Sequence, residues 1–468
     1  MRILHAIHDF LPRHRAGSEI YAFELAREQS ARHDVFVLAA EYDPSTPHGS
    51  LRWRSHGGLT VIELVNNWEF ERFEESYSSR RLNAQLRHVL EATSPDVLHV
   101  HNLLNLSFDL PRLAHQRGMS IVATLHDYTL VCASGGQRVH VAESHVCQVI
   151  DPERCSRCFV QSPLYSQMAA GRLTRRAGGR LLARTAAAVH RLAPSLAVMA
   201  AGALTAGEIH AGDIVRRLAS ARSVLDTIDL FVAPSPFIAA EFERLGVDRH
   251  RLEVSDYGFV PAAAGARAGR ASWNGPLRIG FVGTLVWHKG AHVLLEAARR
   301  LSGDFEIHLH GDTAVFPAYV DGLKRLGPDT RVTFHGGFDR DRLGEIYAAI
   351  DVLVVPSLWP ENSPLVIHEA FMHGVPVVGA RTGGITDLIV DDVSGLLYET
   401  FSAESLATAL QRAIEDRALL ARLAAAMPTV KTMVQDAREW DVRYTAVCAA
   451  RGTVPSDGES LSGPAHTP

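Results

Sequence analysis

Short apolar runs recur along most of the chain, separated by stretches in which apolar residues repeat every three to four positions. Because these runs do not alternate with polar residues, they are typical of strands buried on both faces of a parallel sheet. In the first half we predict strands at Arg2–Ile7, Asp34–Ala39, Thr60–Val65, Val97–His101, Ile121–Leu125, Leu230–Ala233 and Leu252–Ser255. In the second half we predict them at Leu277–Val282, Phe305–Leu309, Arg331–Phe334, Val352–Val355 and Val375–Val378. The pattern indicates an α/β fold.

Residues 261–276 separate the two series of strands and are rich in Ala, Gly and Arg, without hydrophobic periodicity. We therefore expect a linker there, between one doubly wound domain at 1–260 and another at 277–428. One further helix is predicted at 429–451, and the Ser-, Gly- and Pro-rich residues 452–468 are expected to be disordered.

Length, charge and hydropathy narrow the class of protein. The 468 residues are enough for two cores, and the net charge of -5 gives no bulk argument for nucleic-acid binding. No targeting segment opens the sequence, and no apolar stretch approaches the ~20 residues of a membrane span. We therefore expect a cytoplasmic protein that does not bind nucleic acid.

Residues 162–225 form a predicted helical insertion in the first domain. No acid occurs from Arg154 to Gly207, whereas arginines recur at helical spacing. Such a basic helix can lie on an anionic membrane or hold an anionic acceptor, and the alternative is an ordinary solvated face. The sequence therefore allows, but does not require, a peripheral contact between the protein and a membrane.

The segment Trp359–Glu369 places two acids beside an expected helix start. Ser363 is a good N-cap and Pro364 suits the first helical position, so Glu361 would lie in the loop and Glu369 inside the helix. The free amides of a helix start favour an anionic or polyhydroxylated ligand. Glu369 lies in an apolar run and needs hydrogen-bond donors, for which ligand hydroxyls are one source. The alternative is a plain helix start with both acids satisfied by solvent or neighbouring amides.

Lys289 is one of only three lysines among 47 basic residues, which suggests a place where a compact charge is needed. It follows the strand Leu277–Val282, in a loop where α/β sheets bind ligands, and Gly290 permits close approach. Chance placement in a loop is the alternative.

Together the cation and the two acids suit a nucleotide diphosphate-sugar. The cation meets the phosphates and the carboxylates meet the ribose and sugar hydroxyls. A dinucleotide site is less favoured, because no Gly-x-Gly-x-x-Gly follows the first strand of either domain.

The second half resembles the donor-binding half of the family-4 retaining glycosyltransferases of the GT-B fold. The resemblance rests on Gly283…Lys289-Gly290, on Glu361-x7-Glu369 and on Ala380-Arg-Thr-Gly-Gly-Ile-Thr-Asp-Leu-Ile. It covers roughly residues 2–427 and is strongest over 279–398. It implies two Rossmann-like domains that face each other across a cleft.

By this likeness Lys289 would hold the diphosphate, Glu361 the transferred sugar and Glu369 the ribose. The remaining donor pocket would be formed by Gly283, Thr284, Asn362, Ser363, Pro364 and Leu365. Thr284 departs from the pattern, because many relatives carry an Arg there that partners the Lys. Phosphate binding must then rely more on Lys289 and helix amides, or on another Arg.

The first domain carries two further candidates. Gly17 and Ser18 precede the predicted helix Ile20–Gln29, and their amides can meet the donor phosphate or the acceptor. His126 follows a buried strand, and in the similar enzymes a His at this place touches the transferred sugar. A structural role is the alternative for His126, and His99 and His101 are weaker candidates for the same cleft.

Four of the five cysteines cluster in sequence, with the spacing C-x14-C-x7-C-x2-C. In a reducing cytoplasm this spacing favours a structural zinc site over disulfides, and four reduced thiols are the alternative. The expected ligands are Cys132, Cys147, Cys155 and Cys158, with His140 and His145 as substitutes.

The sequence therefore predicts a retaining hexosyltransferase that moves sugar from a nucleotide diphosphate-sugar to a glycan or lipid-linked acceptor in cell-surface polysaccharide or glycolipid synthesis. We expect no metal cofactor in the chemistry, because Lys289 and helix amides would offset the phosphate charge. Two alternatives stay open. One is a nucleotide-sugar epimerase or hydrolase, and the other is a non-catalytic nucleotide-sugar-binding subunit.

Overall fold

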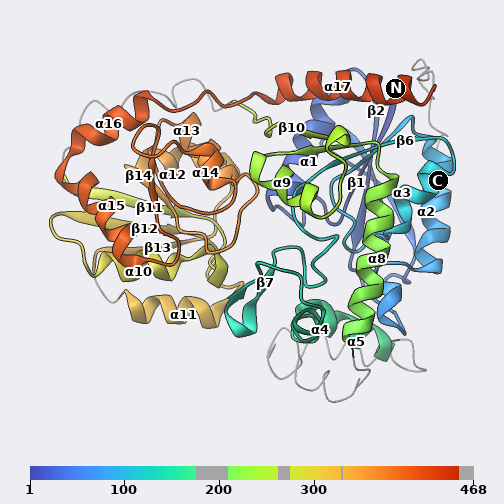
Figure 1. The fold of residues 1–468 in the computed structure, drawn as a ribbon, viewed down its shortest axis with the longest axis horizontal. Coiled ribbons are helices and arrows are strands. Elements are labelled where there is room, and N and C mark those ends of the chain that lie inside the picture. Colours follow the sequence, from blue (N-terminus) through green and yellow to red (C-terminus); the bar gives the residue numbers. More distant parts are fainter. Residues whose placement is uncertain (175–208, 262–274, 328–329, 453–468) are drawn as a thin grey trace.

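The computed structural model describes residues 1–174, 209–261, 275–327 and 330–452. Two mainly parallel sheets form the cores of two lobes that lie side by side (Figure 1). The expected linker and tail fall largely in 262–274 and 453–468, outside the described residues. So do Arg175, Arg176, Arg180, Arg184 and Arg191 of the expected basic helix. Among the helices that are described, none is both long enough and apolar enough to cross a bilayer.

The first sheet has eight strands in the order β10-β9-β6-β5-β1-β2-β4-β3. All pairs are parallel except β3 with β4. The strands are β1 (Arg2–Ile7), β2 (Asp34–Glu41), β3 (Leu51–His56), β4 (Leu59–Val65), β5 (Val97–Val100), β6 (Ser120–Thr124), β9 (Leu230–Ala233) and β10 (Leu252–Val254). The helices are α1 (Gly17–Gln29), α2 (Arg80–Thr93), α3 (Asp109–His115), α8 (Ala211–Thr227) and α9 (Pro236–Arg244).

The second sheet has six strands in the order β13-β12-β11-β14-β15-β16, all parallel. They are β11 (Leu277–Val282), β12 (Phe305–His310), β13 (Val332–Gly336), β14 (Val352–Val355), β15 (Val377–Ala380) and β16 (Leu396–Tyr398). The helices are α10 (Ala291–Ala298), α11 (Pro317–Leu326), α12 (Leu343–Ala349), α13 (Leu365–Met372), α14 (Ile385–Leu388), α15 (Ala403–Glu415) and α16 (Arg417–Ala425). Two central strands, β11 and β14, therefore end beside each other.

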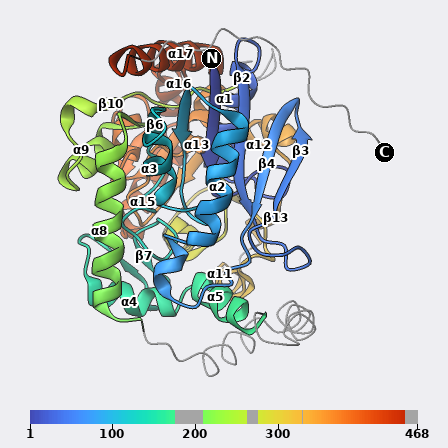
Figure 2. The same cartoon turned by 90° about the vertical axis from the view of Figure 1, so that its right-hand side faces the viewer.

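The last helix, α17 (Met433–Ala450), returns from the second lobe and packs on the first (Figures 1 and 2). Its Trp440 and Tyr444 are fully buried against strands of the first sheet. The carboxylate of Asp436 accepts hydrogen bonds from Tyr21 Oη at 2.8 Å and from Lys431 Nζ at 2.8 Å. Residues near the C-terminus therefore complete the core of the first lobe.

At the opposite end of the first lobe lie a short hairpin and two helices (Figures 1 and 2). The hairpin pairs β7 (Val139–His140) with β8 (His145–Val146), and the helices are α4 (Pro152–Val160) and α5 (Pro163–Thr174). The described parts of the expected insertion at 162–225 are α5 and α8, both helical as predicted.

Candidate active site

The loop after β11 is held against the segment that follows β14. Its Gly283 has φ 146° and donates its N–H to His310 O at 2.9 Å. Gly290 has φ 75°, and a side-chain Cβ there would lie 1.8 Å from Pro356 O. Only glycine allows this approach. The loop thus carries Lys289, in the short helix η4 (Trp287–Lys289), to the edge where Glu361 lies.

Lys289 and Glu361 form a direct ion pair. Lys289 Nζ lies 2.6 Å from Glu361 Oε1, and Ser357 Oγ donates to the same oxygen at 2.6 Å. Glu361 is only 5 % exposed, so this carboxylate needs both donors. The ammonium also lies 5.6 Å from the centre of the Trp359 ring. Thr284 of the same loop is exposed.

Gly383 and Gly384 belong to the motif that begins at Ala380, and their contacts explain why glycine occurs there. Gly384 N donates to Glu361 O at 2.7 Å. A Cβ at Gly384 would lie 1.7 Å from Asn362 O, and one at Gly383 would lie 2.5 Å from Glu361 O. The two glycines therefore let the chain pack directly on the loop that carries the acid.

The predicted helix start at Ser363 was wrong. Helix α13 begins at Leu365, Pro364 is its N-cap residue, and no side chain caps it. The hydroxyl of Ser363 instead donates to Asp256 Oδ1 at 2.8 Å and lies 2.9 Å from His368 Nε2. Ser363 therefore bonds Asp256, which follows β10 in the first lobe, instead of capping the helix.

Glu369 has its own cation. It is 2 % exposed, with Arg340 Nη2 at 2.5 Å from one carboxylate oxygen and Tyr347 Oη donating to the other at 3.1 Å. Burial and the charge of Glu369 raise the pKa of Tyr347 well above its usual value. Sequence reasoning missed Arg340, although Thr284 in place of an Arg had left another Arg open as an alternative to helix amides.

Residues after β1 approach the second lobe from the other side. A Cβ at Gly17 would lie 3.1 Å from Leu365 Cδ1 of α13. Beside it, Ser18 Oγ donates to Glu19 Oε2 at 3.2 Å, and His8 Nε2 lies 3.2 Å from Glu19 Oε1. Burial lowers the pKa of His8, but the hydrogen bond and charge of Glu19 outweigh it and raise that pKa to about 9. His8 and Glu19 therefore form an ion pair at neutral pH.

This ion pair predicts a pH-dependent stability. Because the folded-state pKa of His8 is about 9 and its ordinary value is 6.5, the stabilisation is complete below pH 6.5 and disappears as pH rises through 9. We expect wild type to lose about 3 kcal/mol of unfolding free energy between pH 6 and 10 relative to His8→Gln. Urea unfolding at both pH values measures the difference, with His14→Gln as control. Parallel curves for wild type and His8→Gln would contradict the ion pair.

His126 lies in a directed chain of hydrogen bonds inside the first lobe. Tyr257 Oη is 2.9 Å from His126 Nδ1, and His126 Nε2 is 3.0 Å from His101 Nδ1. The chain continues from His101 Nε2 to His5 Nδ1 at 2.9 Å. It ends with His5 Nε2 at 3.0 Å from Gln29 Oε1. Since that amide oxygen can only accept, each imidazole donates through Nε2 and accepts through Nδ1.

Burial keeps these imidazoles neutral. It lowers the pKa of His126 to about 3 and that of His5 to about 4, and the pKa values of His99 and His101 also fall well below their usual value. Both ring nitrogens of His126 are thus committed to protein partners. A hydrogen bond between this ring and a sugar requires that one of these hydrogen bonds be exchanged. A pocket beside the ring is lined by His101, Asn102, His126, Asp127 and Thr129.

Several contacts join the two lobes at this place. Asn362 Nδ2 donates to the backbone oxygen of His126, and Ser363 reaches Asp256. Arg15 Nη1 lies 3.3 Å from Asp339 Oδ1, and Phe237 N donates to Asp387 Oδ2 at 2.9 Å. The structure therefore brings Gly17, His126 and the segment 361–365 together.

The four clustered cysteines come from three elements at the hairpin end of the first lobe. Cys132 follows β6, Cys147 follows β8, and Cys155 and Cys158 are on α4. Over the described residues, the groups of three or more possible metal ligands whose ligand atoms all lie within 4.8 Å of one another are His5 with His99 and His101, and His8 with Asp9 and Glu19; the cysteine sulfurs do not form such a group. In the first group His5 and His101 make the hydrogen bonds above, and His99 lies 2.7 Å from Tyr444 Oη through Nδ1 and 2.8 Å from Thr124 Oγ1 through Nε2.

Comparisons with known proteins match both halves of the chain. Residues 15–144 match the family model described as Glycosyltransferase Family 4, and residues 267–429 match the model described as Glycosyl transferases group 1. Among curated relatives, a D-inositol 3-phosphate glycosyltransferase of Xylanimonas cellulosilytica is 32% identical over 227 residues, 45% of this chain and 54% of the relative. The lipopolysaccharide core biosynthesis glycosyltransferase LpsE of Rhizobium meliloti is 32% identical over 46% of this chain and 61% of the relative. The matched part thus spans about half the length of these relatives.

Solved structures share the fold at low sequence identity. A complex of Anabaena HepE with UDP and glucose has a TM-score of 0.57 and 17% identity, and the match covers 97% of this chain and 98% of that one. The catalytic domain of starch synthase IV from Arabidopsis thaliana, bound to ADP and acarbose, has a TM-score of 0.60 at 15% identity, with 96% and 99% covered. These likenesses establish the two-domain architecture, known as GT-B.

Proposed function

The chain belongs to the family-4 glycosyltransferases of the GT-B fold, and we propose that it moves a hexose from a nucleotide diphosphate-sugar to an acceptor hydroxyl, with retention at the anomeric carbon. The observation that carries the proposal is the ion pair of Lys289 with the buried Glu361, placed where β11 and β14 end and next to the start of α13.

Donor binding would exchange partners at this pair. The diphosphate replaces Glu361 as the partner of Lys289, and the released carboxylate accepts hydrogen bonds from the sugar hydroxyls. Arg340 and Glu369 can undergo the same exchange, with Glu369 on the ribose and Arg340 supplying the second cation that Thr284 does not. In each exchange the cation gains an anionic partner and the carboxylate gains hydroxyl donors, so neither group is left without a partner.

Catalysis would then rest on position and charge rather than on a protein nucleophile. The acceptor hydroxyl approaches the face from which the diphosphate leaves, and the leaving phosphate takes its proton. Lys289 stabilises the charge that grows on the leaving diphosphate. Asn362 and the backbone of His126, joined across the two lobes, would hold the reacting groups in register.

The names of the relatives support two substrate classes for this chain. HepE is solved with UDP and glucose and starch synthase IV with ADP, so we propose a uridine or adenine nucleotide of a hexose as donor. The curated relatives act on inositol phosphate or in lipopolysaccharide core synthesis, so we propose a polyol or glycan acceptor, free or lipid-linked.

A two-step experiment tests this function. A thermal-shift screen with UDP, GDP, ADP and their hexoses should show one clear stabiliser, because ligand at about 100 times its dissociation constant adds ~2.7 kcal/mol. Proton NMR of the product formed from that donor and an acceptor library should show the donor's anomeric configuration. Nucleotide release without a glycosylated product, an epimerised sugar, or tight binding without turnover would each contradict the proposal.

A further inference from the structure

Three separate elements bring the four cysteines to one place in the first lobe. Cys147 N donates to Arg138 O at 2.8 Å, which ties it to the base of the β7–β8 hairpin. Cys158 Sγ lies 3.8 Å from Val139 O in the same hairpin. Cys155 and Cys158 are three residues apart on α4, so they share one helix face.

Cys132 completes the set from the loop after β6. It lies within electrostatic reach of Cys147, Cys155 and Cys158. All four are free thiols, and Cys158 is buried while the other three are half-buried. Thiols from a loop, a hairpin and a Cys-x-x-Cys helix turn make up the donor set of a structural zinc site.

A buried guanidinium beside the thiols is an independent sign of a missing negative charge. Arg217 of α8 is 5 % exposed and near both Cys132 and Cys155. It donates to Thr129 O at 2.5 Å and to Leu130 O at 2.9 Å. Over the ranges that the structure describes, no carboxylate forms an ion pair with it. A buried charge without a counter-charge is costly, and a tetrathiolate zinc centre carries a net negative charge.

We propose that Cys132, Cys147, Cys155 and Cys158 bind one structural Zn²⁺ ion, with the charge of Arg217 offsetting that of the thiolates. Metal binding releases the thiol protons to solvent and involves no oxidation. Tetrahedral zinc needs sulfurs about 3.8 Å apart, whereas within the described chain no three of these sulfurs all lie within 4.8 Å of one another. Binding must therefore draw them together, and the exposed residues Gln148 and Val149 between the hairpin and α4 can shift to allow it.

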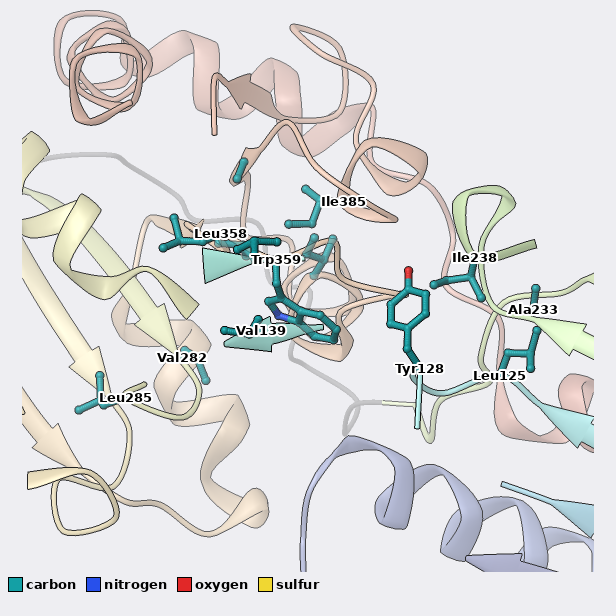
Figure 3. Close-up of a cluster of buried hydrophobic side chains, with 14 of the residues drawn as sticks. Leu125, Tyr128, Val139, Ala233, Ile238, Val282, Leu285, Leu358, Trp359 and Ile385 are labelled. Atoms are coloured by element: carbon teal, nitrogen blue, oxygen red, sulfur yellow. The ribbon is translucent and has the colours of Figure 1, made fainter. Parts of the chain in front are cut away.

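The site would fix the hairpin that reaches toward the donor loop. Val139 of β7 belongs to the apolar cluster that contains Leu358 and Trp359 (Figure 3). Trp359 in turn lies under the ammonium of Lys289. Zinc would thus hold one wall of the proposed donor site without taking part in the chemistry.

Metal analysis of the intact purified chain tests the proposal without an activity assay. Mass spectrometry of the dialysed protein should find about one zinc per chain, and Cys155→Ser and Cys158→Ser should each lose more than about nine-tenths of it. Cys448→Ala, which changes the fifth cysteine in α17, should keep it. Replacement of zinc by cobalt in the wild type should give a sulfur-to-cobalt charge-transfer band that reports thiolate ligands even if the serine variants fold poorly.

Three results would overturn the proposal. They are a metal-free native protein whose thiols all react with an aromatic disulfide reagent, a disulfide among the four cysteines in peptide mapping, and iron with inorganic sulfide in place of zinc.

Discussion

Replacing Lys289 by alanine is expected to lower kcat/KM for the nucleotide-sugar by at least about 100-fold, or ~2.7 kcal/mol of transition-state stabilisation. The change removes the cation proposed to meet the leaving diphosphate. It also leaves Glu361, whose side chain is 7% exposed, without its ionic partner. The loss should therefore appear in kcat as well as in KM, since charge on the diphosphate grows during the reaction.

Lys324 offers a matched control for this variant. Lys324 is exposed on α11, so Lys324→Ala should keep the wild-type kcat/KM. Lys289→Arg retains a charge but not its compact shape, and we expect an intermediate loss. If Lys289→Ala folds and turns over donor at the wild-type rate, the site assignment is wrong.

Replacing Glu369 by alanine is expected to raise KM for the donor by at least roughly tenfold, about 1.4 kcal/mol, with a smaller effect on kcat. A ribose contact is made equally in the ground state and the transition state, so its loss weakens binding without slowing the chemical step. The change also leaves Arg340 and Tyr347 without their carboxylate partner.

Initial-rate kinetics over a range of donor concentration separate the two parameters. Glu345→Ala is the matched control, because Glu345 is an exposed acid that pairs with the exposed Arg342. An unchanged KM in a folded Glu369→Ala variant, or an equal fall in kcat and kcat/KM, would contradict the ribose role.

Most strands could be predicted because they are buried on both faces and therefore read as unbroken apolar runs. Some observed strand boundaries differ from the predicted ones where a single residue disturbs the apolar run. The strand expected at Val375–Val378 is observed at Val377–Ala380, because Pro376 has no N–H to donate to the ladder. The edge strand β3 was missed, since Leu51–His56 contains two arginines and no apolar run, and so resembles a loop.

The site could be predicted in part, for a related reason. Ligand-binding loops follow the carboxyl ends of parallel strands, so Lys289 and Glu361 could be placed together from sequence alone. Arg340 could not, because its segment, Asp339–Arg342, has the composition of any solvated turn. The partner of Ser363 could not either, since Asp256 lies 107 positions away in the chain.

The histidine chain shows the same limit. His5 and His99 are paired residues of β1 and β5, and His101 follows β5 directly. These histidines meet because β1 and β5 are neighbours in the sheet. The residues of the two strands do not by themselves reveal that they are neighbours. Both ring nitrogens of His126 bond other side chains in this series of hydrogen bonds. The position of His126 after a buried strand did not predict those bonds.

The central claim is that Lys289, Glu361 and Glu369 bind one nucleotide-sugar. A crystal structure with the nucleoside diphosphate that stabilises the protein most tests it directly. We predict that a phosphate oxygen replaces Glu361 as the partner of Lys289 Nζ and that Glu369 accepts hydrogen bonds from the ribose. A nucleotide bound elsewhere, with the 2.6 Å pair of Lys289 and Glu361 still intact, would contradict the account.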